Sequence, residues 1–510
     1  MIRTVEQYLE SLRDGRIIYS LGEKVKDVTT HPVLRRVIEH GAMDWVLTND
    51  PERRSLFVTK NEEGEEVNFL WTAPKTAEDL LHKREAYIEG TRYGAMGLHS
   101  MGVDALAASR VLAGRMDNKL GTKYIERVEA YRKYLQTTDL GITGAQTDVK
   151  GDRSLHPSEQ VQHKDYYVRV VDKQKDGIVV RGAKYHISST PCANEAIVLP
   201  CRTHQEKDKD YAVVFATPLN AKGITLISSE PEIRGQTTEE TIWDYPSASV
   251  LGVGDGECMI IFDDVFVPWE RVFMCGEWQF SRDIAYLFGT FHRLFACCRM
   301  VPVLESLTGV AALMAEYNGL EKYPHIRTKL AWLVQLTEGF KIMSKAACMF
   351  PEKEPDMDLA NPNGMYTNIA KYMYAENFHQ ATKAVQDICG GIAADPIPYR
   401  DWMNPEENPY LEKYLGGKAG IPTEHRLRAI RLLLDITNGR HDTHTIHAEG
   451  SLAAQQMMFY TNADWELYKA TAKRDAGIPG WEKHAEVGRL KGYSSLIESK
   501  MPPVDTSYKL

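Results

Sequence analysis

The chain has 510 residues, of which 43% are hydrophobic and 26% charged, and its formal net charge is −9. This length is enough for two or three domains or for one large multi-layer fold with a buried core. The 61 basic residues are outnumbered by 70 acidic ones and form no basic block, which argues against nucleic acid and anionic membranes as partners. Small molecules are therefore the expected ligands.

Neither a membrane span nor a signal peptide is indicated, so we expect a cytoplasmic protein. The sequence has no run of about 18 apolar residues, and its first residues, Met1 to Glu6, lack the charged-then-apolar layout of a secretory leader. Its eight cysteines form no Cys-x-x-Cys pair, so neither a disulfide framework nor a zinc ribbon is suggested. We expect reduced and mostly buried thiols.

Hydrophobic periodicity divides the chain into three parts and predicts an α+β fold. Residues 1–138 carry apolar positions at helical spacing, as in 105–112. Residues 139–276 show short β-branched stretches such as 166–171 and 211–215, separated by Asp-Gly or Lys-Gly turns, and are expected to form a β-domain. Residues 277–510 return to helical patterns such as 301–317 and 426–437 and predict a helical bundle, with a proline-dense loop at 395–409.

A loop of small and turn-forming residues, Gly144 to Ser154, precedes the strand-rich part. Its backbone amides and the polar tips of Gln146, Thr147 and Lys150 are suited to close on a large anionic cofactor. A polar turn between domains would have a similar composition. The run 252–256 lacks the Gly-x-Gly-x-x-Gly spacing, and no Walker-type loop is present, so a cofactor would have to bind outside a Rossmann fold.

Several motifs in one order resemble a known flavoprotein family. They are the segments 6–13, 27–32, 144–154, 176–184 and 262–268. Together they are similar to the family that unites 4-hydroxyphenylacetate 3-monooxygenase with 4-hydroxybutyryl-CoA dehydratase. The resemblance implies an acyl-CoA dehydrogenase-like fold with an N-terminal helical domain, a central β-domain and a C-terminal helical bundle. It also implies FAD held between the β-domain and the last helices, and a homotetramer.

Two further segments correspond to flavin-contacting positions of that family. Ser188, Ser189 and Thr190 follow a predicted strand and offer three hydroxyls, although a plain hydroxyl-rich loop would look the same. Gly390 and Gly391 resemble a glycine pair that meets the flavin of a neighbouring subunit. The alternative is a helix end, where glycine relieves backbone strain.

The region 291–299 decides whether a metal is expected. On a helix, Cys297 would lie about 140° from His292 and Cys298 about 120° the other way, whereas Arg299 would lie within about 20° of it. In the dehydratase branch an iron–sulfur cluster is held by a histidine, by a cysteine seven residues later and by two N-terminal cysteines. His292 resembles the histidine, but Arg299 occupies the cysteine position and residues 97–104 contain no cysteine. We therefore expect no cluster and no other metal, and Cys297 and Cys298 are read as small buried hydrophobes.

Other positions bear on the chemistry in different ways. The tyrosine that the dehydratase branch carries four residues after the histidine is Ala296 here, and His444 stands roughly where that branch has a glutamate. Glu257 resembles a functional glutamate of the branch and is a candidate general base; the alternative is a solvated carboxylate at a strand start. His292 is a candidate base or substrate contact, or else a satisfied core histidine.

The residues with which the 4-hydroxyphenylacetate enzymes bind the phenol are not matched in this sequence, so 4-hydroxyphenylacetate is not the expected substrate. Those enzymes use an arginine and a tyrosine in the N-terminal domain and a histidine near the cofactor loop. The corresponding neighbourhoods hold His99, Met101, Ala105 and Gly144.

The leading prediction is a cluster-free FAD-dependent oxidoreductase, a monooxygenase supplied with reduced flavin (FADH2) by a separate reductase and hydroxylating an aromatic or related small molecule. In it His292 would be a base or a substrate contact, and Arg299 would face a substrate anion or the flavin. One rival is a redox-neutral lyase or isomerase acting on an acyl-CoA, in which Glu257 and His292 would shuttle a proton. Another is a flavin-binding scaffold without catalysis.

Overall fold

The structure is a computed structural model that describes residues 2–230, 236–247, 256–355, 357–438, 445–487 and 502. The chain divides into two compact units, Met1–Gln456 and Met457–Leu510, which are described separately.

The first part of the larger unit is mainly helical, as predicted. Capping boxes at Thr4 and Thr76 begin α1 and α4, and Gly121 ends α5 in the left-handed conformation that glycine adopts without strain. The helices are α1 (Val5–Ser11), α2 (Arg35–Asn49), α3 (Arg54–Phe57), α4 (Ala77–Arg92), α5 (Met101–Leu120) and α6 (Tyr124–Thr138).

This part also contains four short strands that the periodicity did not reveal, because runs of two or three residues carry no readable alternation. They are β1 (Ile18–Ser20), β2 (Glu23–Lys24), β3 (Val58–Lys60) and β4 (Glu66–Asn68). Strands β3 and β4 pair with each other, whereas β1 and β2 join the larger sheet that follows.

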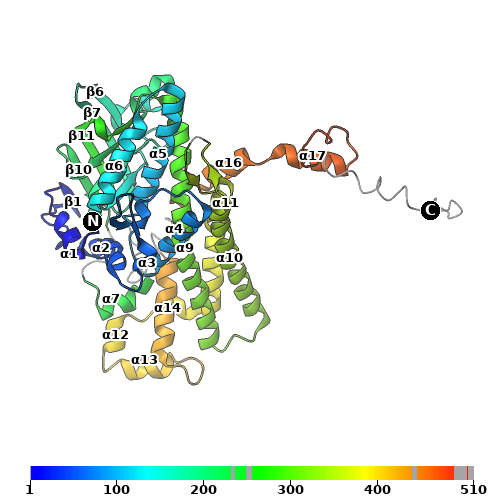
Figure 1. Cartoon of the computed structure of the whole chain (residues 1–510). Coiled ribbons are helices and arrows are strands. Elements are labelled where there is room, and N and C mark those ends of the chain that lie inside the picture. Colours follow the sequence, from blue (N-terminus) through cyan, green and yellow to red (C-terminus); the bar gives the residue numbers. More distant parts are fainter. Residues whose placement is uncertain are drawn as a thin grey trace. The chain divides into compact units, whose positions relative to one another are not determined.

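Two sheets form the β-rich part. A six-stranded sheet has the order β2-β1-β10-β11-β7-β6, and a four-stranded sheet has the order β12-β9-β8-β5. Pairing is antiparallel except between β1 and β10 and between β5 and β8. Figure 1 shows β6, β7, β11 and β10 side by side, with α5 and α6 beside them. The remaining strands are β5 (Ile142–Ala145), β6 (Arg169–Lys173), β7 (Gly177–Ile187), β8 (Glu195–Val198), β9 (Val213–Pro218), β10 (Ile224–Ser228), β11 (Cys258–Pro268) and β12 (Val272–Cys275).

The two predicted strands, 166–171 and 211–215, were correct in place but begin later than expected: β6 begins at Arg169 and β9 at Val213, because 3-10 turns end at Tyr166 and Tyr211. The segments 176–184 and 262–268, which carry part of the family resemblance, lie almost wholly within β7 and β11. One short helix, α7 (Glu239–Asp244), also lies in this part. Alternate residues of facing strands fill one hydrophobic core, in which Phe215 meets Phe262 edge-on at 5.9 Å.

The helical patterns near the C-terminus are confirmed, with one correction. The predicted proline-dense loop 395–409 is not a loop throughout, because it contains the short helix α12 (Tyr399–Met403) and the start of α13 (Asn408–Tyr414), which carries proline near its N-terminus where its missing N–H costs nothing. The other helices are α9 (Ser281–Tyr317), α10 (Pro324–Met349), α11 (Gly364–Cys389) and α14 (Thr423–Thr437), and two short strands, β13 (Glu352–Lys353) and β14 (Ala360–Asn361), pair between α10 and α11.

Helix α9 lies at the centre of the larger hydrophobic core and packs against α4, α5, α10, α11 and α14. Of the helices in the described residues, the segment Trp278–Tyr317 alone is long and apolar enough to cross a membrane, but 72% of its most apolar stretch is buried inside the protein. It is the core helix of the bundle.

The smaller unit contains the end of α16 (Leu452–Asn462) and α17 (Trp465–Asp475), where Trp465 packs on Tyr460 with ring centroids 5.1 Å apart. The division of the whole chain at residues 138 and 276 stays a prediction.

Candidate active site

A cavity of about 1160 Å³ lies where the β-rich part meets α9 and the segment 447–454. It brings together residues that are far apart in the sequence and that the sequence analysis had singled out separately. Those that line it are Gln146, Thr147, Lys150, Ser188, Glu257, His292 and Arg299.

The loop after β5 is held in place by a buried lysine on β7. Lys184 is 1% exposed, and its ammonium group donates to the Asp148 carboxylate at 2.6 Å and to the carbonyl oxygens of Gln146 and Leu199 at 2.8 Å each. The backbone N–H of Tyr185 donates to the Thr147 carbonyl at 2.9 Å. All three ammonium protons are thus used to shape the loop that carries Gln146 and Thr147.

The next residues of the loop turn sharply toward solvent. Lys150 and Gly151 both have positive φ angles, +78° and +56°. A Cβ on Gly151 would lie 2.3 Å from the Tyr166 ring and 2.5 Å from Gln160 Oε1, so this position requires glycine. Lys150 and Arg153, which both line the cavity, make no hydrogen bond or ion pair with any described residue. Their charges are available to an anionic ligand.

The hydroxyl segment after β7 contributes one of its three predicted residues to the cavity wall. Ser188 lines the cavity, and its carbonyl accepts from the Thr143 hydroxyl at 2.8 Å. Ser189 and Thr190 are buried behind it and are not among the lining residues; the Thr190 hydroxyl donates to the Ile187 carbonyl at 2.6 Å.

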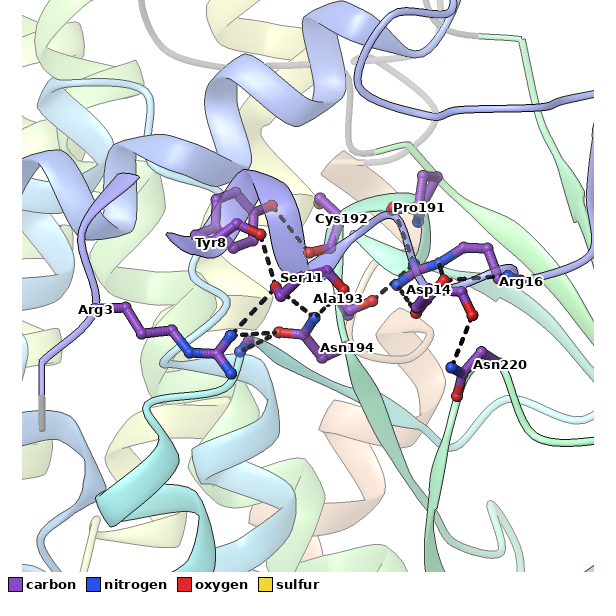
Figure 2. Close-up of polar contacts among 11 residues, drawn as sticks. Arg3, Tyr8, Ser11, Asp14, Arg16, Pro191, Cys192, Ala193, Asn194 and Asn220 are labelled. Atoms are coloured by element: carbon purple, nitrogen blue, oxygen red, sulfur yellow. Dashed lines mark hydrogen bonds and ion pairs between the residues drawn. The ribbon is translucent and has the colours of Figure 1, made fainter. Parts of the chain in front are cut away.

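The N-terminal segment fixes the backbone that follows these hydroxyls (Figure 2). Tyr8 donates its hydroxyl to the Cys192 carbonyl at 2.9 Å, and Arg16 donates to the carbonyls of Pro191 and Ala193 at 3.1 and 2.8 Å. Arg16 is itself held by Asp14 at 2.7 Å. Three consecutive carbonyls are thereby satisfied by side chains far upstream, which makes the wall at Ser188 rigid.

Glu257 lies beside Ser188 at the start of β11. The Ser188 hydroxyl donates weakly to Glu257 Oε1 at 3.4 Å, and the Glu257 carbonyl accepts from the Ser229 N–H at 2.8 Å. The preceding Gly256 has a φ of +53°, and a Cβ there would lie 2.3 Å from Val37 on α2. Glu257 therefore projects from a strand start that is packed tightly against the N-terminal helices.

His292 on α9, which is partly exposed, pairs with the buried Asp104 on α5. His292 Nδ1 lies 3.2 Å from Asp104 Oδ2, and the Asp104 carboxylate is 3% exposed. The rings of Phe288 and Phe295 lie nearly parallel to the imidazole, with centroids 5.0 and 5.8 Å away. Because Nδ1 is engaged by the carboxylate, Nε2 is the nitrogen left for a ligand in the cavity.

Behind this pair lie two further polar groups. Burial raises the pKa of Asp104, an effect that its contact with His292 opposes. Burial lowers the pKa of Lys83 to about 8, although the nearby Asp104 carboxylate acts in the opposite direction. Tyr87 donates its hydroxyl to Asp104 Oδ1 at 3.4 Å. Lys83 and Tyr87 thus both interact with the Asp104 carboxylate.

Arg299 shares the cavity wall with His292, as the helical spacing predicted, and its guanidinium lies 5.7 Å from the Phe295 ring centroid. Cys297 and Cys298 are fully buried and are not among the lining residues. Burial raises the pKa of Cys297 to about 12, so its thiol stays protonated. The reading of both residues as small buried hydrophobes is confirmed.

Gly390 and Gly391 lie at the exposed C-terminal end of α11 and do not line the cavity, and Gly390 has the positive φ expected of a helix end. Their contact with a neighbouring subunit's flavin stays a prediction.

His444 and residues 252–255 lie outside the described residues. Of the phenol-site neighbourhoods, Met101 and Gly144 line the cavity, whereas His99 is buried beside Asp139 at 3.0 Å and Ala105 is buried in the core.

Four residues of this site were not predicted from the sequence. Lys184 could have been recognised from the sequence. Side chains alternate between the two faces of a strand, so Lys184 lies on the same face as the buried Ile178 and Val180 and is a charged residue on an apolar face. Asp104, Arg293 and Glu449 gave no such signal. Their roles depend on contacts between segments 156 to 188 residues apart.

The chain belongs to the 4-hydroxyphenylacetate 3-hydroxylase family: the N-terminal model of that family matches residues 4–274 and the C-terminal model matches residues 281–477. A relative that is 32% identical is the 4-hydroxybutyryl-CoA dehydratase/vinylacetyl-CoA-Δ-isomerase of Clostridium aminobutyricum, with 94% of this chain and 100% of that protein covered. The oxygenase component of 4-hydroxyphenylacetate 3-monooxygenase from Thermus thermophilus is 31% identical, with 86% of this chain and 89% of that protein covered.

Solved structures of both branches superpose well on this chain. A 4-hydroxybutyryl-CoA dehydratase from N. maritimus matches with a TM-score of 0.85 at 31% identity, covering 94% of this chain and 96% of that one. An oxygenase component of 4-hydroxyphenylacetate 3-monooxygenase complexed with FAD matches with a TM-score of 0.82 at 28% identity, covering 93% and 98%. The predicted family and the acyl-CoA dehydrogenase-like α+β fold are therefore confirmed.

Proposed function

We propose that this protein is an FAD-dependent oxidoreductase that works as a reduced-flavin-dependent monooxygenase on a small aromatic or related molecule. The observation that carries the proposal is the shared cavity. The loop after β5, with its basic side chains, forms one wall of the cavity, and the His292–Asp104 pair on α9 and α5 forms another. Relatives at 31% and 28% identity are oxygenase components of 4-hydroxyphenylacetate 3-monooxygenase, which supports this assignment.

The residues present fit FAD. Ligand sites for drug-sized molecules usually measure about 300–1,000 Å³, so a cavity of about 1160 Å³ has room for a dinucleotide and a substrate together. Lys150 and Arg153 suit the pyrophosphate, and Gln146, Thr147 and Ser188 offer polar contacts. Gly144 lets the wall pack closely, because a Cβ there would lie 3.0 Å from the Phe288 ring and 3.3 Å from the Met101 carbonyl.

When bound in reduced form, the flavin supplies two electrons that activate O₂ for transfer of one oxygen atom to the substrate, the other leaving as water. This chain's own residues orient the reactants and exclude water. Phe288 and Phe295 shield the imidazole of His292, and Asp104 fixes its orientation, so that Nε2 can accept or return a proton of the substrate. Glu257, beside Ser188, is the second group able to take a proton.

An iron–sulfur cluster does not fit this site. Cluster ligands are mainly thiolates, and Cys201 is the only cysteine among the residues that line the cavity. Arg299 places a guanidinium on the wall beside His292, where it would repel iron. The side chains that surround the cavity are therefore chemically unsuited to hold an iron–sulfur cluster.

A second function is a redox-neutral lyase or isomerase reaction on an acyl-CoA. The observation that favours it is the 32% identity to the dehydratase over the full length of that protein, together with Glu257 and His292 on one cavity. In such a reaction these two residues would shuttle a proton without oxygen.

Five finer statements belong to the same proposal. A separate reductase delivers the reduced flavin, in keeping with relatives named as oxygenase components. The protein is a cytoplasmic homotetramer, and in it Gly390 and Gly391 at the exposed end of α11 meet the flavin of a neighbouring subunit. Arg299 faces either a substrate anion or the flavin.

The decisive experiment combines composition and turnover. Purified protein should bind FAD, contain no stoichiometric iron or acid-labile sulfide, and consume one O₂ per product when chemically reduced FAD and a phenol from a screened panel are supplied. His292→Gln should lower product yield relative to flavin oxidation while leaving FAD affinity within about threefold. Product formation from an acyl-CoA under strict anaerobiosis, with no oxygen-dependent product from any phenol, would establish the second function instead.

A further inference from the structure

The turn that follows Ser188, residues 189–194, is strained. Ser189 is buried and has a φ of +58°, a left-handed conformation that raises the free energy of a non-glycine residue. The Ser189 hydroxyl makes no hydrogen bond with any described residue, so the side chain does not offset that strain. The Ser189 carbonyl accepts from the N–H groups of Cys192 and Ala193 at 3.2 and 3.1 Å, which closes the turn. A strained turn of this kind persists only where surrounding contacts hold it.

Those contacts come from residues 3–16, here called the N-terminal strap (Figure 2). Arg16 is only 7% exposed, and two of its nitrogens bind the Asp14 carboxylate, Nε at 2.9 Å and Nη2 at 2.7 Å. This bidentate pair fixes the plane of the guanidinium. The remaining nitrogen, Nη1, donates to the carbonyls of Pro191 and Ala193. Arg16 thus bridges two carbonyls of the turn from a position 175 residues upstream of Pro191.

Tyr8 is the second contact of the strap with the turn. Its hydroxyl donates to the Cys192 carbonyl at 2.9 Å, and its ring stacks on Trp45 of α2 with centroids 3.8 Å apart. Trp45 Nε1 donates in turn to Asp139 Oδ2 at 2.9 Å, and the backbone N–H of Arg3 donates to the same oxygen at 3.1 Å. Asp139 lies shortly before β5, so the strap also contacts the chain that leads into this strand.

Asn194 connects the two ends of this arrangement. Its Nδ2 donates to the Ser11 hydroxyl at 2.9 Å, and its Oδ1 accepts from the Gly141 N–H at 3.2 Å. The backbone N–H of Asn194 donates to the Gly141 carbonyl at 2.7 Å. Gly141 lies immediately before β5, and β5 leads into the loop that carries the proposed cofactor contacts. The strap is therefore tied both to the turn after Ser188 and to the start of β5.

We propose that the N-terminal strap is a positioning element of the cofactor site and that Arg16 is its principal positioning residue. The inference deepens the proposed function and rests on it. Arg16 does not line the cavity and acts through the turn 189–194. Without its guanidinium, the carbonyls of Pro191 and Ala193 lose their donor and the Asp14 carboxylate loses its cation. The strain at Ser189 can then relax, which moves the cavity wall at Ser188.

The test compares Arg16→Met with wild type in the full-length protein. FAD affinity, measured by fluorescence quenching, should fall about tenfold or more, and the visible circular dichroism of the flavin bound at saturation should change. In the flavin-free protein, hydrogen exchange followed by mass spectrometry should become faster in residues 189–194. Tyr8→Phe is the milder second variant, because it removes one hydrogen bond and keeps the stacked ring. It should lower FAD affinity about threefold.

Two matched controls separate positioning from a general loss of stability. Arg13→Met changes the same strap, but Arg13 is 49% exposed and pairs with Glu10 and Asp27 rather than with the turn. Val267→Ala leaves a small cavity in the same hydrophobic core, at the opposite end of β11 from the strand pair that precedes Ser188. Both variants should bind FAD within about twofold of wild type and keep the wild-type circular dichroism of the bound flavin.

The proposal is overturned if Arg16→Met binds FAD within about twofold of wild type, or if Val267→Ala loses as much affinity, because stability alone would then explain the effect. If Arg16→Met does not fold, Tyr8→Phe decides: a threefold loss supports the proposal, and wild-type affinity overturns it.

Failure of the proposed function gives a different result, in which wild-type protein binds no FAD. Hydrogen exchange on the flavin-free protein then decides the role of the strap alone. Faster exchange of residues 189–194 in Arg16→Met, but not in Arg13→Met, supports the strap as the element that holds the turn. Equal exchange in both variants removes that role as well.

Discussion

Replacing Lys184 with methionine should cost more stability than any exposed charge on the same strand. Lys184 is 1% exposed and uses all three ammonium protons, on Asp148 and on the carbonyls of Gln146 and Leu199. The variant leaves the Asp148 carboxylate buried without its cation and two carbonyls without a donor. Breaking a buried ion pair from one side costs about 3–5 kcal/mol, so we expect Lys184→Met to lower the free energy of unfolding by that amount.

The matched control is Arg181→Met, three residues earlier on β7. Arg181 makes a bidentate contact with Asp264, at 2.6 and 2.8 Å, but the two side chains are 39% and 52% exposed. Exposed pairs are screened by water, so this variant should change stability little. Urea unfolding of both flavin-free variants beside wild type, followed by circular dichroism, measures the difference.

The double variant Lys184→Met/Asp148→Asn separates the electrostatic effect from the shape of the loop. Removing the unpaired carboxylate should recover part of the lost stability, but the carbonyls of Gln146 and Leu199 still lack their donor. FAD affinity, measured by fluorescence quenching, should therefore remain at least about tenfold below wild type. The proposed role of Lys184 is refuted if Lys184→Met unfolds like Arg181→Met, or if it binds FAD as tightly as wild type.

Two further predictions concern backbone strain and pH. Gly151→Ala should destabilise the protein by about 1–3 kcal/mol more than Gly121→Ala, because both have positive φ but only Gly151 would drive a methyl against the Tyr166 ring; equal urea midpoints would contradict this. Although burial opposes protonation, the contact with Asp139 raises the pKa of His99 above its usual value, so this histidine stabilises the fold below pH about 6.5 and loses that contribution as pH rises through its folded-state pKa. His99→Gln should flatten the fall in stability above pH about 6.5, and parallel curves for the two proteins would refute the assignment.

The sequence allowed a good account of the scaffold because the relevant signals are local. Apolar spacing along residues 301–317 and 426–437 belongs to one helix each, and a loop of small residues can be recognised without knowing its partners. Even Lys184 was readable from strand alternation. What could not be predicted is the pairing of Asp104 with His292, 188 residues apart, because helical periodicity gives the face of each helix but not which helices pack together. Arg293 and the Glu449 carbonyl, 156 residues apart, were hidden for the same reason.

His292 shows why similarity to the dehydratase does not by itself carry over the role of a metal ligand to this position. By resemblance the position belongs to a metal ligand, and a metal would both hold the ring and determine which nitrogen is free. Here the ring is held without one, because Phe288 and Phe295 restrict its tilt and Asp104 engages Nδ1 at 3.2 Å. A histidine oriented by organic contacts keeps Nε2 open to a ligand. With Arg299 and Arg293 on the same helix, this wall carries two cations beside the imidazole and is poorly suited to iron.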